Sequence, residues 1–93
     1  MNHTKKYVCI VCGYDGLVEP PYGKGGAVSD EICPCCCFQY GLDDYKYEDK
    51  KKAFLEWRAE WEHNGYPWFS TSTKPLDHWN PVRQLENVKK HFT

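Results

Sequence analysis

The sequence predicts a small α+β fold, in which a cysteine-bearing β segment is followed by an amphipathic helix, an irregular aromatic crossing and a C-terminal helix. Three observations predict it: all six cysteines fall within residues 7–42, residues 45–63 repeat aromatic side chains at a helical period, and Asn80 opens a last apolar-periodic stretch. The length of 93 residues predicts one domain, residues 1–93. We expect residues 7–42 and the helical, aromatic-rich residues 43–93 to be its two parts.

The hydrophobic composition limits what such a domain can bury. Leu, Ile, Val and Phe account for 17 of the 93 residues, whereas Trp, Tyr and Phe account for 15. A domain this small with few aliphatic side chains usually needs a disulfide or a metal ion to supplement its core. The six cysteines are the candidates for that role.

Residues 7–42 are expected to form short strands joined by turns. The run Tyr7–Val11 is typical of a strand. Residues 19–26 contain Pro20, Pro21 and three glycines, which disfavour a continuous strand and predict a long connecting loop.

The strongest helix signal covers residues 45–63. Tyr47, Phe54, Trp57 and Trp61 fall within one stripe at about 100° per residue. Six polar residues face away from that stripe: Glu48, Asp49, Lys52, Glu56, Glu60 and His63. This division into an apolar and a polar face predicts a helix that lies on the core.

Signals at both ends bound this helix. Asp43 and Asp44 suit the positive end of the helix dipole. Asn64-Gly65 supplies a left-handed stop, and Pro67 prevents the helix from continuing. The start of the helix is predicted only to within a few residues.

Residues 66–79 are expected to form an irregular but ordered crossing. Trp68, Phe69 and Trp79 in it are large enough that we expect them to be buried. The last helix is expected to begin at Pro81, with Asn80 as its N-cap, because proline suits the first helical turn. Its core side chains are expected to be Leu85, Val88 and Phe92, and its basic end Lys89, Lys90 and His91.

The spacing of four cysteines predicts a metal site. Cys9 and Cys12 are separated by two residues, as are Cys33 and Cys36, and 20 residues lie between the pairs. Two thiolates on one tight turn can both reach one ion at about 2.3 Å, and two such turns complete a tetrahedron. We therefore expect one zinc ion on these four cysteines, with iron as the alternative metal. A reduced metal-free core and a disulfide framework are the remaining alternatives.

The residue that follows each Cys-x-x-Cys pair is expected to be left-handed. Gly13 adopts that conformation without strain, whereas a non-glycine residue such as Cys37 pays about 1–2 kcal/mol. Either Cys37 tolerates the strain, or the second turn is built differently and Cys35 or Cys37 is a ligand. Otherwise Cys35 and Cys37 are spare thiols, expected to be semi-exposed and unreactive, with a redox-sensing or metal-exchange role as the alternative.

These motifs carry a resemblance to known proteins. The run Tyr7-Val8-Cys9-Ile10-Val11-Cys12-Gly13-Tyr14, with Cys33-Pro34-Cys35-Cys36, resembles the paired knuckles of rubredoxins and zinc ribbons. Residues 12–17 and 32–38 more closely resemble the small bacterial cysteine-rich CPCC proteins. This resemblance implies a zinc-ribbon-like β segment that binds metal, and it implies no activity. Two departures are that Cys37 stands where such knuckles usually have glycine, and that the 20-residue gap is shorter than in typical rubredoxins.

Several classes of protein fit this sequence poorly. No apolar run approaches the roughly 20 residues of a membrane span, and residues 7–11 are too short for a signal-peptide core of about 7–15 residues. We therefore expect a cytoplasmic protein. A formal net charge of −1 argues against nucleic acid, and residues 50–52, the only basic run, are expected to be a solvated helix face.

Nothing in the sequence predicts catalysis. The four histidines are scattered, and His78, beside Asp77 and Trp79, is the only one in a context of interest; it is expected to be satisfied or exposed. Residues 23–26 lack the spacing of a phosphate-binding loop. A four-thiolate zinc site is also coordinatively closed, whereas catalytic zinc keeps a position for water.

The expected function is therefore structural metal binding in a non-catalytic protein-interaction module. The predicted partner is another protein, because tryptophans such as Trp57, Trp61, Trp68 and Trp79 are suitable interface anchors, although most of them are expected to form the core. A rubredoxin-like iron electron carrier is the alternative, and a nucleic-acid-binding ribbon is a weaker one.

Overall fold

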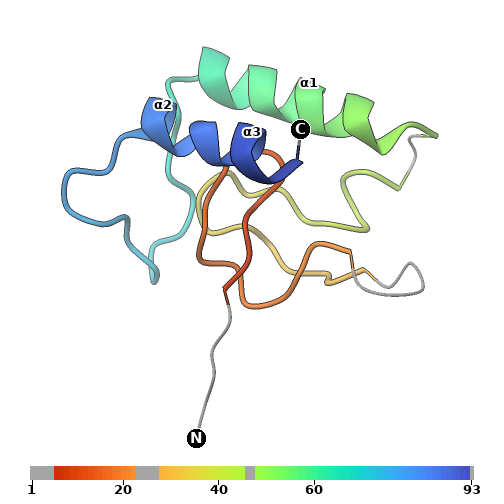
Figure 1. The fold of residues 1–93 in the computed structure, drawn as a ribbon, viewed down its shortest axis with the longest axis horizontal. Coiled ribbons are helices and arrows are strands. Elements are labelled where there is room, and N and C mark those ends of the chain that lie inside the picture. The colour runs from red at the N-terminus through yellow and green to blue at the C-terminus, as the bar shows by residue number, and fades with distance from the viewer. Residues whose placement is uncertain (1–5, 23–27, 46–47, 93) are drawn as a thin grey trace, which may run out of the picture.

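Three helices lie against a cysteine-bearing loop layer. The structure is a computed structural model, and it describes residues 6–22, 28–45 and 48–92. The helices of these ranges are α1 (Lys50–His63), α2 (Pro81–Gln84) and α3 (Glu86–Phe92). Figure 1 shows α1 and the α2–α3 segment beside each other on one side of the molecule, with the N-terminal half of the chain looped beneath them. None of the described helices is long and apolar enough to cross a membrane.

The predicted β segment is only weakly developed, so this part of the α+β prediction needs correction. In the described part of residues 7–42, pairing is limited to three isolated antiparallel bridges: Tyr7 with Leu17, Tyr22 with Val28, and Ile32 with Gln39. Tight cysteine turns lie directly inside two of these bridges, which leaves few residues there for further pairing. The fold is thus mostly helical with little sheet. Residues 23–26 of the predicted loop lie outside the described residues.

The amphipathic helix is confirmed but begins later than predicted. Its N-cap is Asp49, whose carboxylate accepts a hydrogen bond from the Lys51 N–H at 3.0 Å. Phe54 and Trp61 are buried, and Trp57 is partly buried against the same core. Tyr47, the first residue of the predicted stripe, lies outside the described residues.

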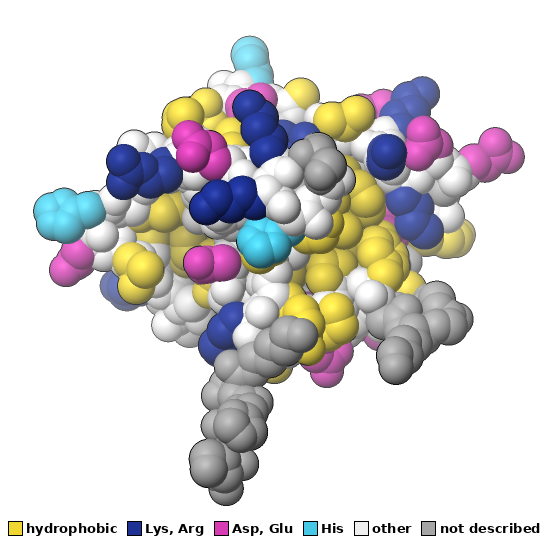
Figure 2. All heavy atoms as spheres, in the orientation of Figure 1, with side chains coloured by type: hydrophobic (Ala, Val, Ile, Leu, Met, Phe, Trp, Pro, Cys, Tyr) yellow, Lys and Arg dark blue, Asp and Glu magenta, His cyan; other side chains and the backbone are white. Residues whose placement is uncertain are grey.

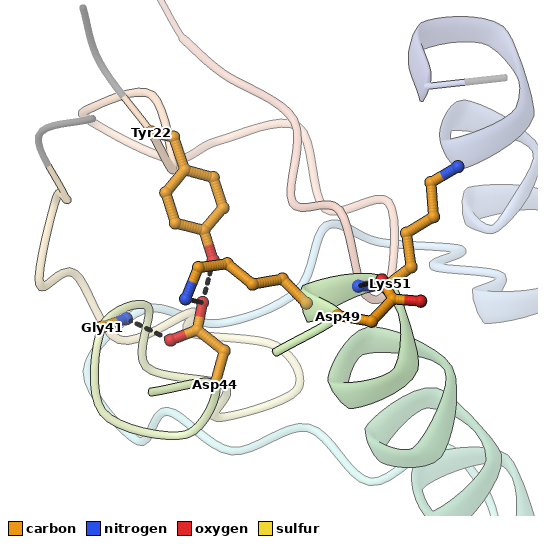
Figure 3. Close-up of polar contacts among 6 residues, drawn as sticks. Tyr22, Gly41, Asp44, Asp49 and Lys51 are labelled. Atoms are coloured by element: carbon orange, nitrogen blue, oxygen red, sulfur yellow. Dashed lines mark hydrogen bonds and ion pairs between the residues drawn. The ribbon is translucent and has the colours of Figure 1, made fainter. Parts of the chain in front are cut away.

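Asp43 and Asp44 do not serve the dipole of this helix, contrary to the prediction. Asp44 is fully buried, and its carboxylate accepts hydrogen bonds from the Tyr22 hydroxyl and from the Gly41 N–H at 2.9 Å, as Figure 3 shows. Asp43 accepts a hydrogen bond from the Gln39 N–H at 2.8 Å. Both carboxylates therefore close the turn between the second cysteine motif and α1, because nearby backbone N–H groups offer closer partners.

The predicted stop of α1 is confirmed. Gly65 has φ +88°, and the Tyr66 N–H donates back to the Trp61 carbonyl at 2.9 Å. The left-handed conformation of Gly65 thus brings the Tyr66 N–H back to a carbonyl that would otherwise lack a hydrogen-bond partner at the helix end.

The predicted C-terminal helix is divided into α2 and α3 at Leu85. Asn80 caps α2 as predicted, since its side-chain oxygen accepts from the Arg83 N–H at 3.1 Å. Val88 is buried, whereas Phe92, predicted to be a core residue, is 41% exposed. The division brings the end of α2 against the first cysteine motif, where Gln84 makes the contacts described below.

Aromatic rings and thiols together form the core. Residues 66–79 contain no helix or strand, as predicted, and Trp68 and Trp79 pack partly buried against that core. Phe69 is 53% exposed, which corrects the prediction that it is buried. The buried cluster consists of Cys9, Val11, Cys12, Leu17, Cys33, Cys35, Cys36, Phe38, Tyr40, Phe54 and Trp61. Edge-to-face ring pairs such as Phe38–Tyr40 and Phe38–Trp57 supply the packing that few aliphatic side chains could provide.

Candidate metal centre

Each Cys-x-x-Cys pair lies at the start of a tight turn with the same hydrogen bonds. We call these turns the first knuckle (residues 9–14) and the second knuckle (residues 33–38). In each, the N–H of the first cysteine donates to the carbonyl of the sixth residue, at 2.7 Å in the first knuckle and 3.0 Å in the second. The N–H of the fifth residue donates back to the carbonyl of the first cysteine, at 3.0 and 2.9 Å. The two segments are therefore local copies, which explains why both pairs present their sulfurs in the same way.

The knuckles bring four thiols together. The Sγ atoms of Cys9, Cys12, Cys33 and Cys36 all lie within 4.8 Å of one another, and all four residues are buried. Cys9 Sγ lies 3.9 Å from Cys36 Sγ, and Cys12 Sγ lies 3.7 Å from Cys33 Sγ. Metal–sulfur bonds of about 2.3 Å in a tetrahedron require sulfurs about 3.8 Å apart, whereas a disulfide requires about 2.05 Å. This cluster can therefore hold a metal ion.

The electrostatics of the cluster favour a cation. Burial raises the pKa of Cys9, but hydrogen bonds from the thiols of Cys12, Cys33 and Cys36 and from Tyr40 outweigh it, so the pKa of Cys9 lies well below its ordinary value. Burial and the neighbouring sulfurs raise the pKa of Cys12 well above its ordinary value. Thiols this close cannot all ionise alone because their negative charges repel. A divalent cation offsets that repulsion and displaces the protons.

Tyr40 supports the cluster from the second knuckle side. Its hydroxyl lies 2.9 Å from Cys9 Sγ and also accepts the Ile10 N–H at 3.0 Å. One buried hydroxyl can thus donate to a cysteine sulfur while satisfying the backbone of the first knuckle. Partners of this kind commonly fix the ligand orientation and tune metal affinity.

Removing this hydroxyl is expected to weaken metal binding without unfolding the protein. In Tyr40→Phe, Cys9 loses a donor that lowers its pKa, so protons compete better for its sulfur. We expect metal affinity to fall by about 10–100-fold, the usual effect of losing such a partner. The pH at which half of the metal is released should rise, because release occurs as pH falls through the ligand pKa.

Competition with a chromogenic chelator across a pH series measures both quantities. Tyr45→Phe is the matched control, since Tyr45 is 67% exposed. An unchanged affinity and release pH in Tyr40→Phe would show that the hydroxyl does not act on Cys9.

Side chains from the helices bind the outward carbonyls of both knuckles. Arg58 on α1 donates to the carbonyls of Val11 at 2.5 Å and Ile10 at 2.7 Å. Trp57, one residue earlier, donates from its indole nitrogen to the Cys36 carbonyl at 2.8 Å. A single turn of α1 therefore fixes both knuckles, and sequence analysis missed Arg58. Its position four residues after Phe54 and three before Trp61, on the apolar stripe, was the available signal.

The C-terminal segment supports the first knuckle in the same way. The Gln84 side-chain amide donates to the Cys12 carbonyl at 3.0 Å, and its oxygen accepts from the Trp79 indole at 2.7 Å. Asn87 donates to the Gly13 carbonyl at 3.0 Å. Residues more than 70 positions away thus hold this turn, which no local sequence pattern could indicate.

Cys35 and Cys37 lie in different environments. Cys35 is fully buried, which corrects the prediction that it is semi-exposed. A hydrogen bond with Cys12 lowers the pKa of Cys35, and the Gln84 amide, 3.4 Å from its sulfur, acts in the same direction. Cys37 is half-buried, and burial raises its pKa. His78, the histidine of interest in the sequence, is exposed.

The two residues after the pairs are left-handed, as predicted. Gly13 has φ +85° and Cys37 has φ +71°. Cys37 therefore tolerates the strain, and the second knuckle is not built differently. Replacing Cys37 by glycine is expected to stabilise the metal-bound protein by about 1 kcal/mol, because the strained side chain is removed.

Urea unfolding with measured metal content tests this substitution. Cys37→Ala is the control, since it removes the thiol but keeps the strained Cβ. A metal content below that of the wild type in Cys37→Gly would contradict the prediction and identify Cys37 as a ligand.

Comparison with known proteins gives a partial match and no function. The chain is 43% identical over 42 residues to the uncharacterized protein YozI and 44% identical over 41 residues to the uncharacterized protein YoaQ, both of Bacillus subtilis strain 168. Each alignment covers 43% of this chain and 35% of the relative, so the chain matches about a third of the length of these curated relatives. No family model matches, so membership of the CPCC family stays a prediction, and no solved structure matches. The chain is thus similar, over less than half its length, to two Bacillus subtilis proteins without an assigned function.

Proposed function

We propose that this protein binds one structural zinc ion through Cys9, Cys12, Cys33 and Cys36. The observation that carries the proposal is the set of four buried sulfurs at the separations of a tetrahedral site. A metal ion there would link two knuckles that share little sheet pairing. Its binding energy would supplement a core that contains few aliphatic side chains.

Four thiolates would leave no open coordination position for water or substrate, which is the arrangement of structural zinc. The side chains that bind the knuckle carbonyls, among them Arg58, Trp57 and Gln84, serve to hold the turns rather than to face a substrate. These contacts support a non-catalytic role, and we propose that the protein serves as a cytoplasmic protein-interaction module. A tetrahedral four-sulfur site also accepts iron, which defines the alternative of an electron carrier.

Metal analysis of freshly purified protein tests the proposal. Elemental mass spectrometry is expected to give one zinc per chain, and the same sample should show no visible absorption. One iron per chain, with a red chromophore that bleaches on reduction, would instead favour the alternative of an electron carrier. Metal-free protein with an unchanged fold would contradict both.

A further inference from the structure

A groove between α1 and α3 crosses the first knuckle. One hollow of about 360 Å³ lies between the two helices, and its apolar lining is Ile10, Phe54, Leu55, Val88 and Phe92. A second hollow of about 500 Å³ shares Ile10 and Phe92 with the first and continues past Pro20 and Pro21. We call the two together the knuckle groove. Figure 2 shows an extended hydrophobic area on this face, with Lys and Arg side chains along its edges.

Two apolar side chains of the groove are exposed. Leu55 on α1 is 58% exposed and Phe92 at the end of α3 is 41% exposed. They line the groove together with the buried Phe54 and Val88, so its lining combines buried and exposed apolar side chains. Contiguous exposed apolar surface with a polar border is typical of a binding site.

The knuckle groove is lined by four basic side chains and, within the described residues, by no carboxylate. They are Lys6, Lys51, Arg58 and His91. The whole chain has a formal net charge of −1, so the basic character of the groove lining does not follow from the overall composition. The nearest hollow with carboxylates in its lining is the one beyond Arg58, where Glu62 and Glu86 appear. Figure 3 shows the Lys51 side chain extending from the start of α1 towards the C-terminal helix.

We propose that the knuckle groove binds the apolar face of an acidic amphipathic segment of a partner protein. Apolar anchors would fill the hollows beside Leu55 and Phe92, and flanking carboxylates would face Lys51 and His91. The proposal rests on the proposed interaction function and adds the surface and the chemistry of the partner.

The groove is also joined to the metal centre. Ile10, which lines both hollows, lies between Cys9 and Cys12 in the first knuckle. Arg58, which lines the first hollow, binds the carbonyls of Ile10 and Val11. Loss of the metal should therefore displace Ile10 and Arg58 in the groove, and we expect partner binding to depend on metal loading.

Peptide binding to the full-length, metal-analysed protein tests the proposal. Three labelled peptides of about four helical turns share Leu and Phe at positions i, i+3, i+4 and i+7 and carry Glu, Gln or Lys on the polar face. By fluorescence anisotropy, the Glu peptide is expected to bind about tenfold more tightly than the Gln peptide, and the Lys peptide most weakly. The preference for the Glu peptide over the Gln peptide should shrink as the salt concentration is raised. Addition of a metal chelator should abolish binding.

Two variants and one control locate the site. Leu55→Asp and Lys51→Glu are expected to reduce binding of the Glu peptide about tenfold or more. Neither should unfold the protein, because both side chains are exposed. Leu76→Asp makes the same Leu-to-Asp change at a side chain that is 83% exposed and outside the groove, and should bind as the wild type does.

The outcomes separate this proposal from the zinc assignment. Zinc-loaded protein that binds none of the peptides, or binds all three equally, overturns the groove proposal and leaves the metal site intact. A dimer in sedimentation experiments that Leu55→Asp abolishes would assign the groove to a second copy and also overturn it. Selective peptide binding by protein that never holds metal would instead overturn the zinc function.

Discussion

Replacing Cys33 by serine is expected to abolish metal binding and the folded state together. The site offers four sulfurs, and Cys33 Sγ lies 3.7 Å from Cys12 Sγ. The change removes one of these ligands and leaves three buried sulfurs, which must either repel one another as thiolates or remain protonated. Structural zinc contributes about 10–16 kcal/mol of apparent binding free energy in small domains. Small domains are stable by only about 5–15 kcal/mol in total. Losing a large part of the zinc binding free energy therefore costs more than the whole free energy of unfolding, and the protein should unfold.

Cys9→Ser should behave in the same way, since Cys9 supplies the equivalent ligand of the first knuckle and also contacts the Tyr40 hydroxyl. Elemental analysis and circular dichroism of both variants measure the effect. Addition of a strong chelator to the wild type should produce the same unfolded spectrum, and excess zinc should restore it.

Cys37→Ser provides the matched control for these variants. Cys37 carries the same side chain in the second knuckle, but it is half-buried and outside the four-sulfur cluster. The control is expected to retain one metal ion and wild-type stability. A metal-free Cys33→Ser protein as stable as the wild type would contradict the structural role of the metal.

The sequence predicted the four-cysteine cluster because its determinants are local. Two residues between cysteines fix how one turn presents its sulfurs, and a left-handed residue after each pair closes that turn, as Gly13 and Cys37 do. The apolar period of Phe54, Trp57 and Trp61 likewise identified the face of α1 that lies on the core. Each of these signals depends on neighbours within a few residues.

Features that depend on distant partners were not predictable in this way. The predicted ribbon shows only single bridges in its described part, and the knuckle turns beside two of them are bound by Arg58 and Trp57 from α1. Asp44 was predicted to lie at the start of the helix, but it is buried and accepts a hydrogen bond from the Tyr22 hydroxyl. Cys35 is buried because Gln84, 49 residues later, covers its sulfur. In each case a tertiary hydrogen bond outweighs a local preference.

The contact between the first knuckle and the C-terminal helices makes Gly13→Ala the other strongly destabilising change. Gly13 has φ +85°, and a Cβ there would overlap the carbonyl oxygen of Gln84 and lie 3.0 Å from its carbonyl carbon. The methyl group would push α2 away from the knuckle. That movement would break the hydrogen bonds from Gln84 to the Cys12 carbonyl and from Asn87 to the Gly13 carbonyl.

Gly65→Ala isolates the backbone part of this cost. Gly65 has φ +88°, nearly the same conformation, but no atom lies within 4 Å of a Cβ built there. Left-handed strain of about 1–2 kcal/mol is thus common to both variants. Gly13→Ala should lose about 2 kcal/mol more, because the two partly buried hydrogen bonds from Gln84 and Asn87 contribute about 1 kcal/mol each. Urea unfolding of both metal-loaded variants measures the difference, and equal losses of stability would mean that α2 does not press on the knuckle. A larger loss in Gly13→Ala would show that the C-terminal segment holds the metal-binding turn in place.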